Sequence, residues 1–447
     1  MTGDDADSGR TIEPLSVVRG ELSAPGSKSL AQRAIVLAAL AQGVTRIVNL
    51  PRGEDVAAAR ALLAAVGVEH HAPTPASLAV TGRPPSWRGG WRAERVEVGE
   101  SGTLARLALA ALALCAEPGS QVEIVARGTL ERRATAPLVD ALERSGVRFE
   151  RREWPLRLIP IGPASTLELR DPLSSQEASA LAIALASYPD ENELAIVGEL
   201  PSRPYFDMTR AMLERFGARA TCIESADAEH WRIRGPLRAP EQPLVVEPDA
   251  SLASVALAAA CLSGGEVLVK GLSRESVQGD VAIVQRLRDF GCRAQFAPQA
   301  ISASGFPQHG ADLDLSGQPD LAPVLAAIAA GAALVAPHGR TSSTLRGLET
   351  LDRKESRRLE VLTDALARAG WRVSCDSSSL TVDAPTSVLP TSELRLDPRG
   401  DHRMAFAFAL LGLLRPGVVV EQPSCVAKSW PAFWRDMDAL GLRTRAV

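Results

Sequence analysis

The spacing of hydrophobic and polar positions repeats six times along the chain. In each repeat an Ala- and Leu-rich stretch opens at a polar residue, and a later amphipathic stretch ends at a glycine. The apolar stretches begin near Ser29, Ser101, Ser174, Asp249, Asp320 and Asp401. The closing glycines, which are 79, 71, 74, 79 and 71 residues apart, are Gly67, Gly146, Gly217, Gly291, Gly370 and Gly441. A near-constant period of this length predicts one folding unit copied six times.

Short β-branched or apolar segments between the helical stretches predict strands. Examples lie at 44–50, 121–128, 193–199, 266–271 and 418–423, each after a turn that contains Gly or Pro. The pattern predicts an α/β (α+β) fold built from βαββαβ units of roughly 75 residues. The first helix of each unit is apolar on nearly every face, so we expect it to be buried, with the amphipathic helix outside it.

A proline-rich stretch at 235–246 separates the third repeat from the fourth. We interpret it as a crossing between two domains of three units each. Residues 16–24 have the pattern of a strand, whereas no strand is evident after Gly441, so the N-terminal strand is expected to complete the second domain. These boundaries predict a first domain at 26–246 and a second domain made of 1–25 and 247–447, with the active site in the cleft between them.

The composition restricts the class of protein. The chain has 447 residues, of which 46% are apolar and 23% charged, as in ordinary soluble proteins. A net charge of -4 argues against a nucleic-acid partner. The six cysteines are scattered without metal-ligand or disulfide spacing, so no metal site is expected. The N-terminus does not resemble a leader peptide and the apolar stretches are too short to span a bilayer, so we expect a cytoplasmic protein without a membrane partner.

The helix starts carry the candidate chemistry, because a capped helix N-terminus attracts anions. In PGSKSLAQR, Lys28 stands at the start of a helix, Ser29 can cap it, and Arg33 lies one turn further. The motif is not a P-loop, since the spaced glycine is missing. In GESGTLAR, Gly102 permits a close backbone approach to a ligand, and Arg106 follows one turn later.

Further charged motifs occupy corresponding places in later repeats. In RKESRRL, a helix would place Lys354 and Arg358 on one face with Glu355 alongside. Other polar positions occur in GTLERRATAPL, SSQ, PSRPYFD, DHR and AKSWP. Several of these motifs carry cations, which together could bind more than one phosphate or carboxylate if they converge on one place. These cations are Lys28, Arg133, Arg358, Arg403 and Lys428.

The order of these motifs resembles the 5-enolpyruvylshikimate-3-phosphate synthase family from about residue 22 to 435. The resemblance implies two domains of three units each around buried parallel helices, an inside-out α/β barrel. It also implies transfer of the enolpyruvyl group of phosphoenolpyruvate to the 5-hydroxyl of shikimate 3-phosphate, with release of phosphate, in the shikimate pathway to chorismate and the aromatic amino acids. The reaction needs no cofactor, glyphosate inhibits the family, and we expect a monomer.

The resemblance also assigns roles to residues. Those that would bind shikimate 3-phosphate are Lys28, Ser29, Arg33, Ser174, Ser175, Gln176, Ser202, Tyr205, Asp320 and Lys354. Those that would bind phosphoenolpyruvate are Lys28, Gly102, Arg133, Gln176, Arg358, Arg403 and Lys428. Asp320 would take the proton of the attacking hydroxyl, Glu355 would protonate the methylene carbon, and Lys28 would act as a further acid.

The sequence departs from the family pattern at Glu100, Leu107, Thr350 and Arg357, where Asn, Pro, Asn and Asp are usual. The departures at Glu100, Thr350 and Arg357 leave open an enolpyruvyl transferase for a related cyclic substrate. A non-catalytic paralogue is the other alternative, which the retention of Asp320 and Glu355 disfavours. The sister transferase for UDP-N-acetylglucosamine is also disfavoured, because GTLERRA lacks its reactive Cys and Ser29 follows Lys28.

Overall fold

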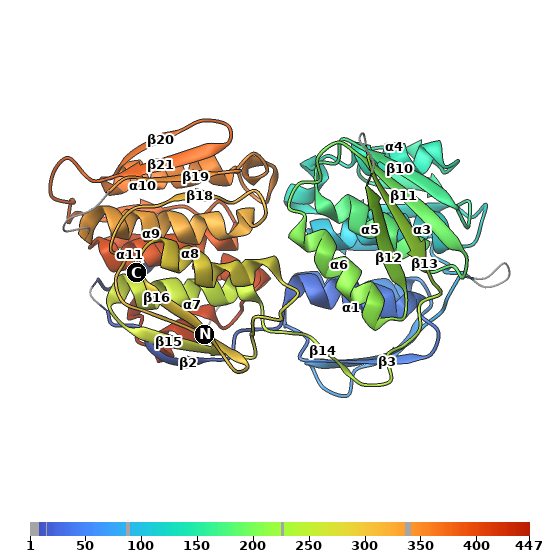
Figure 1. Cartoon of the computed structure of the whole chain (residues 1–447), viewed down its shortest axis with the longest axis horizontal. Coiled ribbons are helices and arrows are strands. Elements are labelled where there is room, and N and C mark those ends of the chain that lie inside the picture. The colour runs from blue at the N-terminus through green and yellow to red at the C-terminus, as the bar shows by residue number, and fades with distance from the viewer. Residues whose placement is uncertain (1–8, 15, 86–89, 225–227, 336–340) are drawn as a thin grey trace. The chain divides into compact units, whose positions relative to one another are not determined.

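The computed structural model describes residues 9–14, 16–85, 90–224, 228–335 and 341–447 (Figure 1). The chain divides into two compact units. The first unit is Gly26–Val246, and the second unit combines Met1–Pro25 with Glu247–Val447.

Within the described residues, each unit contains three four-stranded sheets with one shared pairing scheme. In every sheet the first two strands in spatial order pair in parallel, and the third and fourth strands each run antiparallel to the strand before them. In the first unit the orders are β14(Leu244–Val245)-β3(Val44–Val48)-β5(Ser77–Thr81)-β4(Glu69–His71), β6(Arg95–Gly99)-β7(Val122–Ala126)-β9(Leu156–Ile159)-β8(Arg148–Arg151) and β10(Thr166–Arg170)-β11(Glu191–Val197)-β13(Glu229–Arg234)-β12(Arg219–Glu224). In the second unit they are β2(Arg19–Leu22)-β15(Glu266–Lys270)-β17(Ala300–Ser304)-β16(Arg293–Ala297), β18(Asp312–Asp314)-β19(Ser343–Arg346)-β21(Ser379–Asp383)-β20(Arg372–Cys375) and β22(Leu394–Leu396)-β23(Val418–Val420)-β1(Arg10–Ile12)-β24(Thr444–Ala446).

The order of elements within a repeat is βαβαββ, so the predicted βαββαβ order is wrong. The second repeat shows this, with the sequence β6, α3(Gly102–Cys115), β7, α4(Ala136–Arg144), β8 and β9. After the glycine that ends the outer helix, the chain forms an antiparallel hairpin before the next repeat begins. Both hairpin strands are needed to complete the sheet, since β7 pairs with β9 and β9 with β8.

The Ala- and Leu-rich helices are buried on nearly all sides, as predicted. They are α1(Lys28–Leu40), α3, α5(Ser175–Leu185), α7(Ala250–Ser263), α9(Ala322–Val335) and α11(His402–Leu414). In α3 every residue except Thr103 is buried. In the second unit α7, α9 and α11 pack against one another (Figure 1). Small alanine side chains allow such helices to approach closely, which favours dense packing of the core.

All six inner helices begin near the predicted positions, and the predicted polar caps are confirmed at four of them. Ser101, Ser174, Asp249 and Asp401 are N-caps whose side chains accept backbone N–H groups. At the other two starts the predicted polar residue is not the cap. The helix α1 begins at Lys28 after the N-cap Ser27, which leaves Ser29 inside it. Asp320 lies in the short 3-10 helix η3(Pro319–Leu321) ahead of α9, where the ring of the preceding proline suits a helical first turn.

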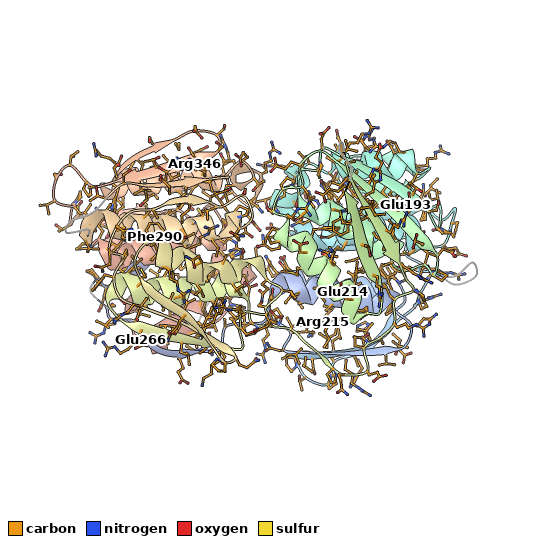
Figure 2. All side chains as sticks on the ribbon, in the orientation of Figure 1. Glu193, Glu214, Arg215, Glu266, Phe290 and Arg346 are labelled. Atoms are coloured by element: carbon orange, nitrogen blue, oxygen red, sulfur yellow. The ribbon has the colours of Figure 1, made fainter. Side chains whose placement is uncertain are left out.

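The outer helices end before glycines in the left-handed region, as predicted. These helices are α2(Glu54–Ala65), α4, α6(Pro204–Arg215), α8(Ile283–Asp289), α10(Arg358–Ala369) and α12(Phe433–Ala439). The six closing glycines have φ values from 70° to 113°, which a residue with a Cβ adopts only at a cost. Figure 2 labels Phe290, the buried C-cap residue of α8, and Glu214 and Arg215 at the exposed end of α6.

At the chain ends the structure contains the predicted strand within 16–24 and two strands that were not predicted, β1 and β24. The structure does contain a strand after Gly441, since β24 pairs with β1. The segment 16–24 forms β2, which pairs in parallel with β15. Both N-terminal strands therefore belong to sheets of the second unit, and they cover strand edges that would otherwise expose unpaired N–H and C=O groups. In the part of the chain that the structure describes, the helices are too short or too polar to cross a membrane.

Candidate active site

A buried ion cluster in the second unit is centred on Arg358, whose side chain is 1% exposed. Its guanidinium donates from Nε to Asp401 Oδ2 at 2.8 Å, from Nη1 to Asp320 Oδ1 at 2.9 Å and from Nη2 to Glu355 Oε2 at 2.5 Å. Burial alone would lower the pKa of Arg358, but the three carboxylates outweigh it and raise the pKa. Arg358 is therefore a fixed cation that orients three acidic groups.

Asp320 contacts three cations within this cluster. Besides Arg358, the Arg403 Nη2 lies 3.1 Å from Asp320 Oδ2, and the Lys354 Nζ lies 3.6 Å from Oδ1. Burial would raise the pKa of Asp320, but Arg403, Lys354 and Arg358 together hold the pKa well below its usual range. Asp320 is therefore an ionised carboxylate, and its capacity to accept a proton depends on how strongly these cations hold it.

Glu355 belongs to the same cluster, and Lys428 Nζ lies 4.0 Å from Glu355 Oε1. Lys354 and Arg358 do not share a helix face, so that prediction is wrong. Lys354 follows the 3-10 helix η4(Leu351–Arg353), and α10 begins only at Arg358. The helix starts late because the Asp352 carboxylate accepts the Leu359 N–H at 2.9 Å and caps it from outside.

In the first unit the starts of the inner helices are linked by side-chain hydrogen bonds. Gln32 of α1 donates to Ser101 Oγ, the N-cap of α3, at 2.5 Å. Gln176 of α5 donates to Thr103 Oγ1 of α3 at 3.1 Å. A Cβ at Gly102 would lie 3.2 Å from Arg133 Nη1 and 3.5 Å from Gln176 Oε1. The structure therefore brings Gly102, Arg133 and Gln176 together, and a side chain at 102 would crowd them.

Arg106 connects this group to the loop that carries Arg133. The Arg106 side chain donates to Gly102 O at 3.3 Å and to Ala134 O at 2.7 Å. Burial lowers the pKa of Arg106 to about 10. The nearby Glu177 carboxylate opposes this change, whereas the positive charge of Arg133 lowers the pKa further. Arg106 therefore ties the Arg133 loop, which includes η1(Gly128–Arg132), to the start of α3.

Lys28 and Arg33 of α1 contact different elements of the first unit. Lys28 Nζ lies 3.0 Å from Asp55 Oδ2 at the start of α2. Arg33 is 1% exposed, and it donates to Thr209 Oγ1 at 2.7 Å and to Tyr205 O at 3.2 Å on α6. Burial lowers the pKa of Arg33 to about 10, with an opposing effect from Tyr205. The sequence did not reveal that Arg33 joins α1 to α6 within the core.

The serine positions lie at element starts. Ser174 caps α5 in a capping box with Glu177, and Ser175 is 2% exposed. Ser202 has a φ of 54°, and its carbonyl accepts the Tyr205 N–H at 3.1 Å near the start of α6. Ser29 accepts the Arg33 Nη1 at its carbonyl at 3.1 Å. These serines thus mark the same ends of α1, α5 and α6 that carry the charged residues.

Several residues that the sequence did not single out belong to the Arg358 cluster, lie close to it, or lie at the helix starts of the first unit. They are Glu177, Ser251, Asp280 and Ser356. Ser356 donates to Asp401 Oδ2 at 3.0 Å, and Asp280 follows a Gln-Gly pair just ahead of α8. That polar turn ahead of an amphipathic helix was the available signal for Asp280. Among the described residues, no group of three or more His, Cys, Asp or Glu side chains could hold a metal ion.

The fold places the chain in a class of solved proteins. An EPSP synthase from Acinetobacter baumannii has a TM-score of 0.76 and 20% identity, with 98% of this chain and 99% of that chain covered. The enolpyruvyl transferase NikO from Streptomyces tendae has a TM-score of 0.71 and 18% identity, with 98% of each chain covered. At these identities the similarity shows that the chain has the enolpyruvyl transferase fold.

Sequence comparison defines the family. The family model for EPSP synthase (3-phosphoshikimate 1-carboxyvinyltransferase) matches residues 12–437. The 3-phosphoshikimate 1-carboxyvinyltransferase of Syntrophobacter fumaroxidans is 35% identical, over 96% of this chain and 99% of the relative. That of Pectobacterium carotovorum is 33% identical, over 96% and 98%. The chain belongs to the EPSP synthase family and is a transferase.

Proposed function

We propose that this chain transfers the enolpyruvyl group of phosphoenolpyruvate to the 5-hydroxyl of shikimate 3-phosphate and releases phosphate. The observation that carries the proposal is the bonding of Asp320 and Glu355 to one buried guanidinium, that of Arg358. Addition to a carbon–carbon double bond needs a base at the hydroxyl and an acid at the carbon. Asp320 can act as the base in its carboxylate form and Glu355 as the acid in its protonated form, and the Arg358 guanidinium holds both side chains in place.

The proton steps follow from these two groups. Asp320 takes the proton of the 5-hydroxyl while that oxygen bonds to C2 of phosphoenolpyruvate, and Glu355 delivers a proton to C3. In the elimination, Glu355 recovers a proton from the C3 methyl group as the bond between C2 and the phosphate oxygen breaks. Lys28 gives a proton to the departing phosphate, and the proton that Asp320 took from the hydroxyl restores Lys28 to its charged form. All protons are then accounted for.

Substrate charge solves the difficulty posed by the low pKa of Asp320. Arg403, Lys354 and Arg358 hold the Asp320 carboxylate strongly in the structure. When anionic groups of phosphoenolpyruvate share Arg403 and Arg358, the attraction on Asp320 weakens and its pKa rises. Asp320 therefore becomes an effective base when phosphoenolpyruvate is bound, which links proton transfer to the presence of both substrates.

Membership of the EPSP synthase family supports binding roles for the remaining residues. Shikimate 3-phosphate is bound by Lys28, Ser29, Arg33, Ser174, Ser175, Gln176, Ser202, Tyr205, Asp320 and Lys354, and phosphoenolpyruvate by Lys28, Gly102, Arg133, Gln176, Arg358, Arg403 and Lys428. Because these sets draw on both units, we also propose two inside-out α/β barrel domains that act together on one pair of substrates. We further propose a cytoplasmic monomer.

The departures from the family pattern bear on the choice of substrate. Arg357, where Asp is usual, is 69% exposed and pairs with Glu360 at 2.8 Å, so its charge points away from the Arg358 cluster. Glu100 packs against Gly128, at the start of the segment that leads to Arg133. Glu100 is the observation that favours the second candidate, transfer to a related cyclic substrate, because it adds a carboxylate beside an anion-binding loop.

Phosphate release from phosphoenolpyruvate, measured with and without shikimate 3-phosphate, tests the proposal. We expect release only when both compounds are present. Release that does not depend on shikimate 3-phosphate, or none with it, would defeat the main proposal. A parallel assay with unphosphorylated shikimate and related cyclohexene alcohols distinguishes the second candidate, which predicts faster release with one of them.

A further inference from the structure

A chain of buried polar groups lies behind Arg403 in the second unit. The Arg403 Nη1 donates to the Ser251 hydroxyl on α7, and the Arg403 Nη2 contacts Asp320 Oδ2 at 3.1 Å. The Asp280 carboxylate lies close enough to Arg403 and Ser251 for both to lower its pKa. Ser251 is 5% exposed and Asp280 is 4% exposed. Ser251, Arg403 and Asp320 are thus linked by direct contacts, and the buried Asp280 carboxylate lies close to them.

The position of Asp280 is set by its neighbour Gln278. The Gln278 side chain accepts the Ala250 N–H at 3.1 Å, at the first residue of α7, and donates to Pro248 O at 2.8 Å. These bonds fasten the turn η2(Gly279–Ala282) to the start of α7, which also carries Ser251. Asp280 is therefore held against Ser251 by the surrounding backbone.

We propose that Ser251 and Asp280 are positioning residues that fix the Arg403 guanidinium in the orientation in which it binds an anionic group of phosphoenolpyruvate. This inference rests on the proposed function. A serine hydroxyl has one hydrogen and two lone pairs, and it can rotate. Because a guanidinium can only donate, a lone pair of the Ser251 hydroxyl faces Arg403, and the nearby negative charge of Asp280 favours the orientation in which the hydroxyl hydrogen points away from the guanidinium.

A purely structural role would not require a carboxylate at this place. Burying an ionised group costs free energy unless it is paired and hydrogen-bonded. Burial and the nearby Asp320 raise the pKa of Asp280 to about 6, while Arg403 and Ser251 oppose the rise. At neutral pH Asp280 is thus still largely ionised, and its charge helps to hold Arg403 on the side of the guanidinium opposite to a substrate anion.

Four variants test the inference: Ser251→Ala, Ser251→Thr, Asp280→Asn and the control Ser254→Ala. Ser254 is a buried residue of the same helix, and its hydroxyl donates to the Ser251 carbonyl at 2.6 Å. We expect Ser251→Ala to raise the KM for phosphoenolpyruvate about tenfold or more, with the KM for shikimate 3-phosphate within twofold. Asp280→Asn should raise the same KM several-fold. Ser251→Thr, which keeps the hydroxyl, should have a KM for phosphoenolpyruvate near the wild-type value.

The melting temperature of each variant separates positioning from folding. Ser254→Ala should lower it as much as Ser251→Ala does while leaving both KM values near the wild type. An unchanged KM for phosphoenolpyruvate in Ser251→Ala would overturn the inference. So would equal increases in both KM values, or failure of Ser251→Thr to restore the lower value.

Crystal structures of the wild type, Ser251→Ala and Ser254→Ala give a readout that needs no turnover. Displacement of the Arg403 guanidinium from Asp320 in Ser251→Ala alone would support the positioning role, and an unmoved guanidinium would overturn it. If the wild type releases no phosphate in the presence of shikimate 3-phosphate, the proposed function fails on that assay, whereas the structures still decide the role of Ser251 in holding Arg403.

Discussion

Glu177 provides a sharp test of the electrostatics at the start of α5. Its side chain lies in the core at 0% exposure and accepts the backbone N–H groups of Leu173 at 2.9 Å and Ser174 at 3.3 Å. Burial raises its pKa from 4.5 to about 7, although Arg106 and these two N–H groups oppose the rise. The folded protein therefore binds the Glu177 proton more tightly than the unfolded chain does.

The sign of the effect on stability follows from linkage. Between about pH 4.5 and pH 7 the folded state binds more protons at Glu177 than the unfolded state, so this residue lowers the free energy of unfolding as pH rises through that window. Above pH 7 the full cost is present. A rise from 4.5 to about 7 corresponds to about 3 kcal/mol, and the attraction to Arg106 is already included in it.

Glu177→Gln removes the charge and keeps an amide oxygen that can accept both N–H groups of the capping box. We expect the variant to be more stable than the wild type by about 3 kcal/mol at pH 8 and by less than about 1 kcal/mol at pH 5. Urea unfolding at the two pH values measures the difference, and hydrogen exchange of the α5 amides assigns the transition to the first unit.

The control is Glu214→Gln, an exposed position on α6 of the same unit (Figure 2). It should show the same free energy of unfolding as the wild type, within a few tenths of a kcal/mol, at both pH values. The reasoning is refuted if Glu177→Gln gives equal stability changes at pH 5 and pH 8, or if the variant is less stable than the wild type at pH 8.

Further predictions concern catalysis and the helix starts. Asp320→Asn should lower turnover by about 100- to 10,000-fold, with a much smaller loss of affinity for shikimate 3-phosphate in calorimetry because the amide can still hydrogen-bond to the substrate; normal turnover would remove its role as the base. Glu355→Gln should abolish deuterium exchange from D2O into C3 of phosphoenolpyruvate, and retained exchange would reassign the acid. Gly128→Ala should cost about 1–2 kcal/mol of stability, because φ is +57° and a Cβ would overlap the Glu100 carboxylate. The Glu100→Ala background should recover part of that cost, and full additivity would contradict the overlap. Leu107→Pro, within α3 and 1% exposed, should cost about 3 kcal/mol and change the inhibition constant for glyphosate; equal constants would show that residue 107 has no influence on the helix start at Gly102.

Local features of the chain could be predicted because they depend on single residues and their near neighbours. The left-handed turn at Gly370 favours glycine wherever it occurs, and the caps at Ser101 and Asp249 satisfy N–H groups two or three residues away. The resemblance in motif order also identified the family, which the comparison over residues 12–437 confirmed. Prediction failed where a longer-range partner changed a local preference, as when Asp352 delays the start of α10.

The sequence by itself determined the sixfold repeat, the burial of its apolar helices and the residues at their starts. The tertiary structure alone decided which of those residues meet. Asp320 accepts hydrogen bonds from Arg358 and Arg403, which lie 38 and 83 positions further along the chain. Arg403 also donates a hydrogen bond to Ser251, which is 152 positions away in the sequence. Periodicity does not encode such pairings, because the packing of α7, α9 and α11 sets the distances between side chains that are remote in sequence.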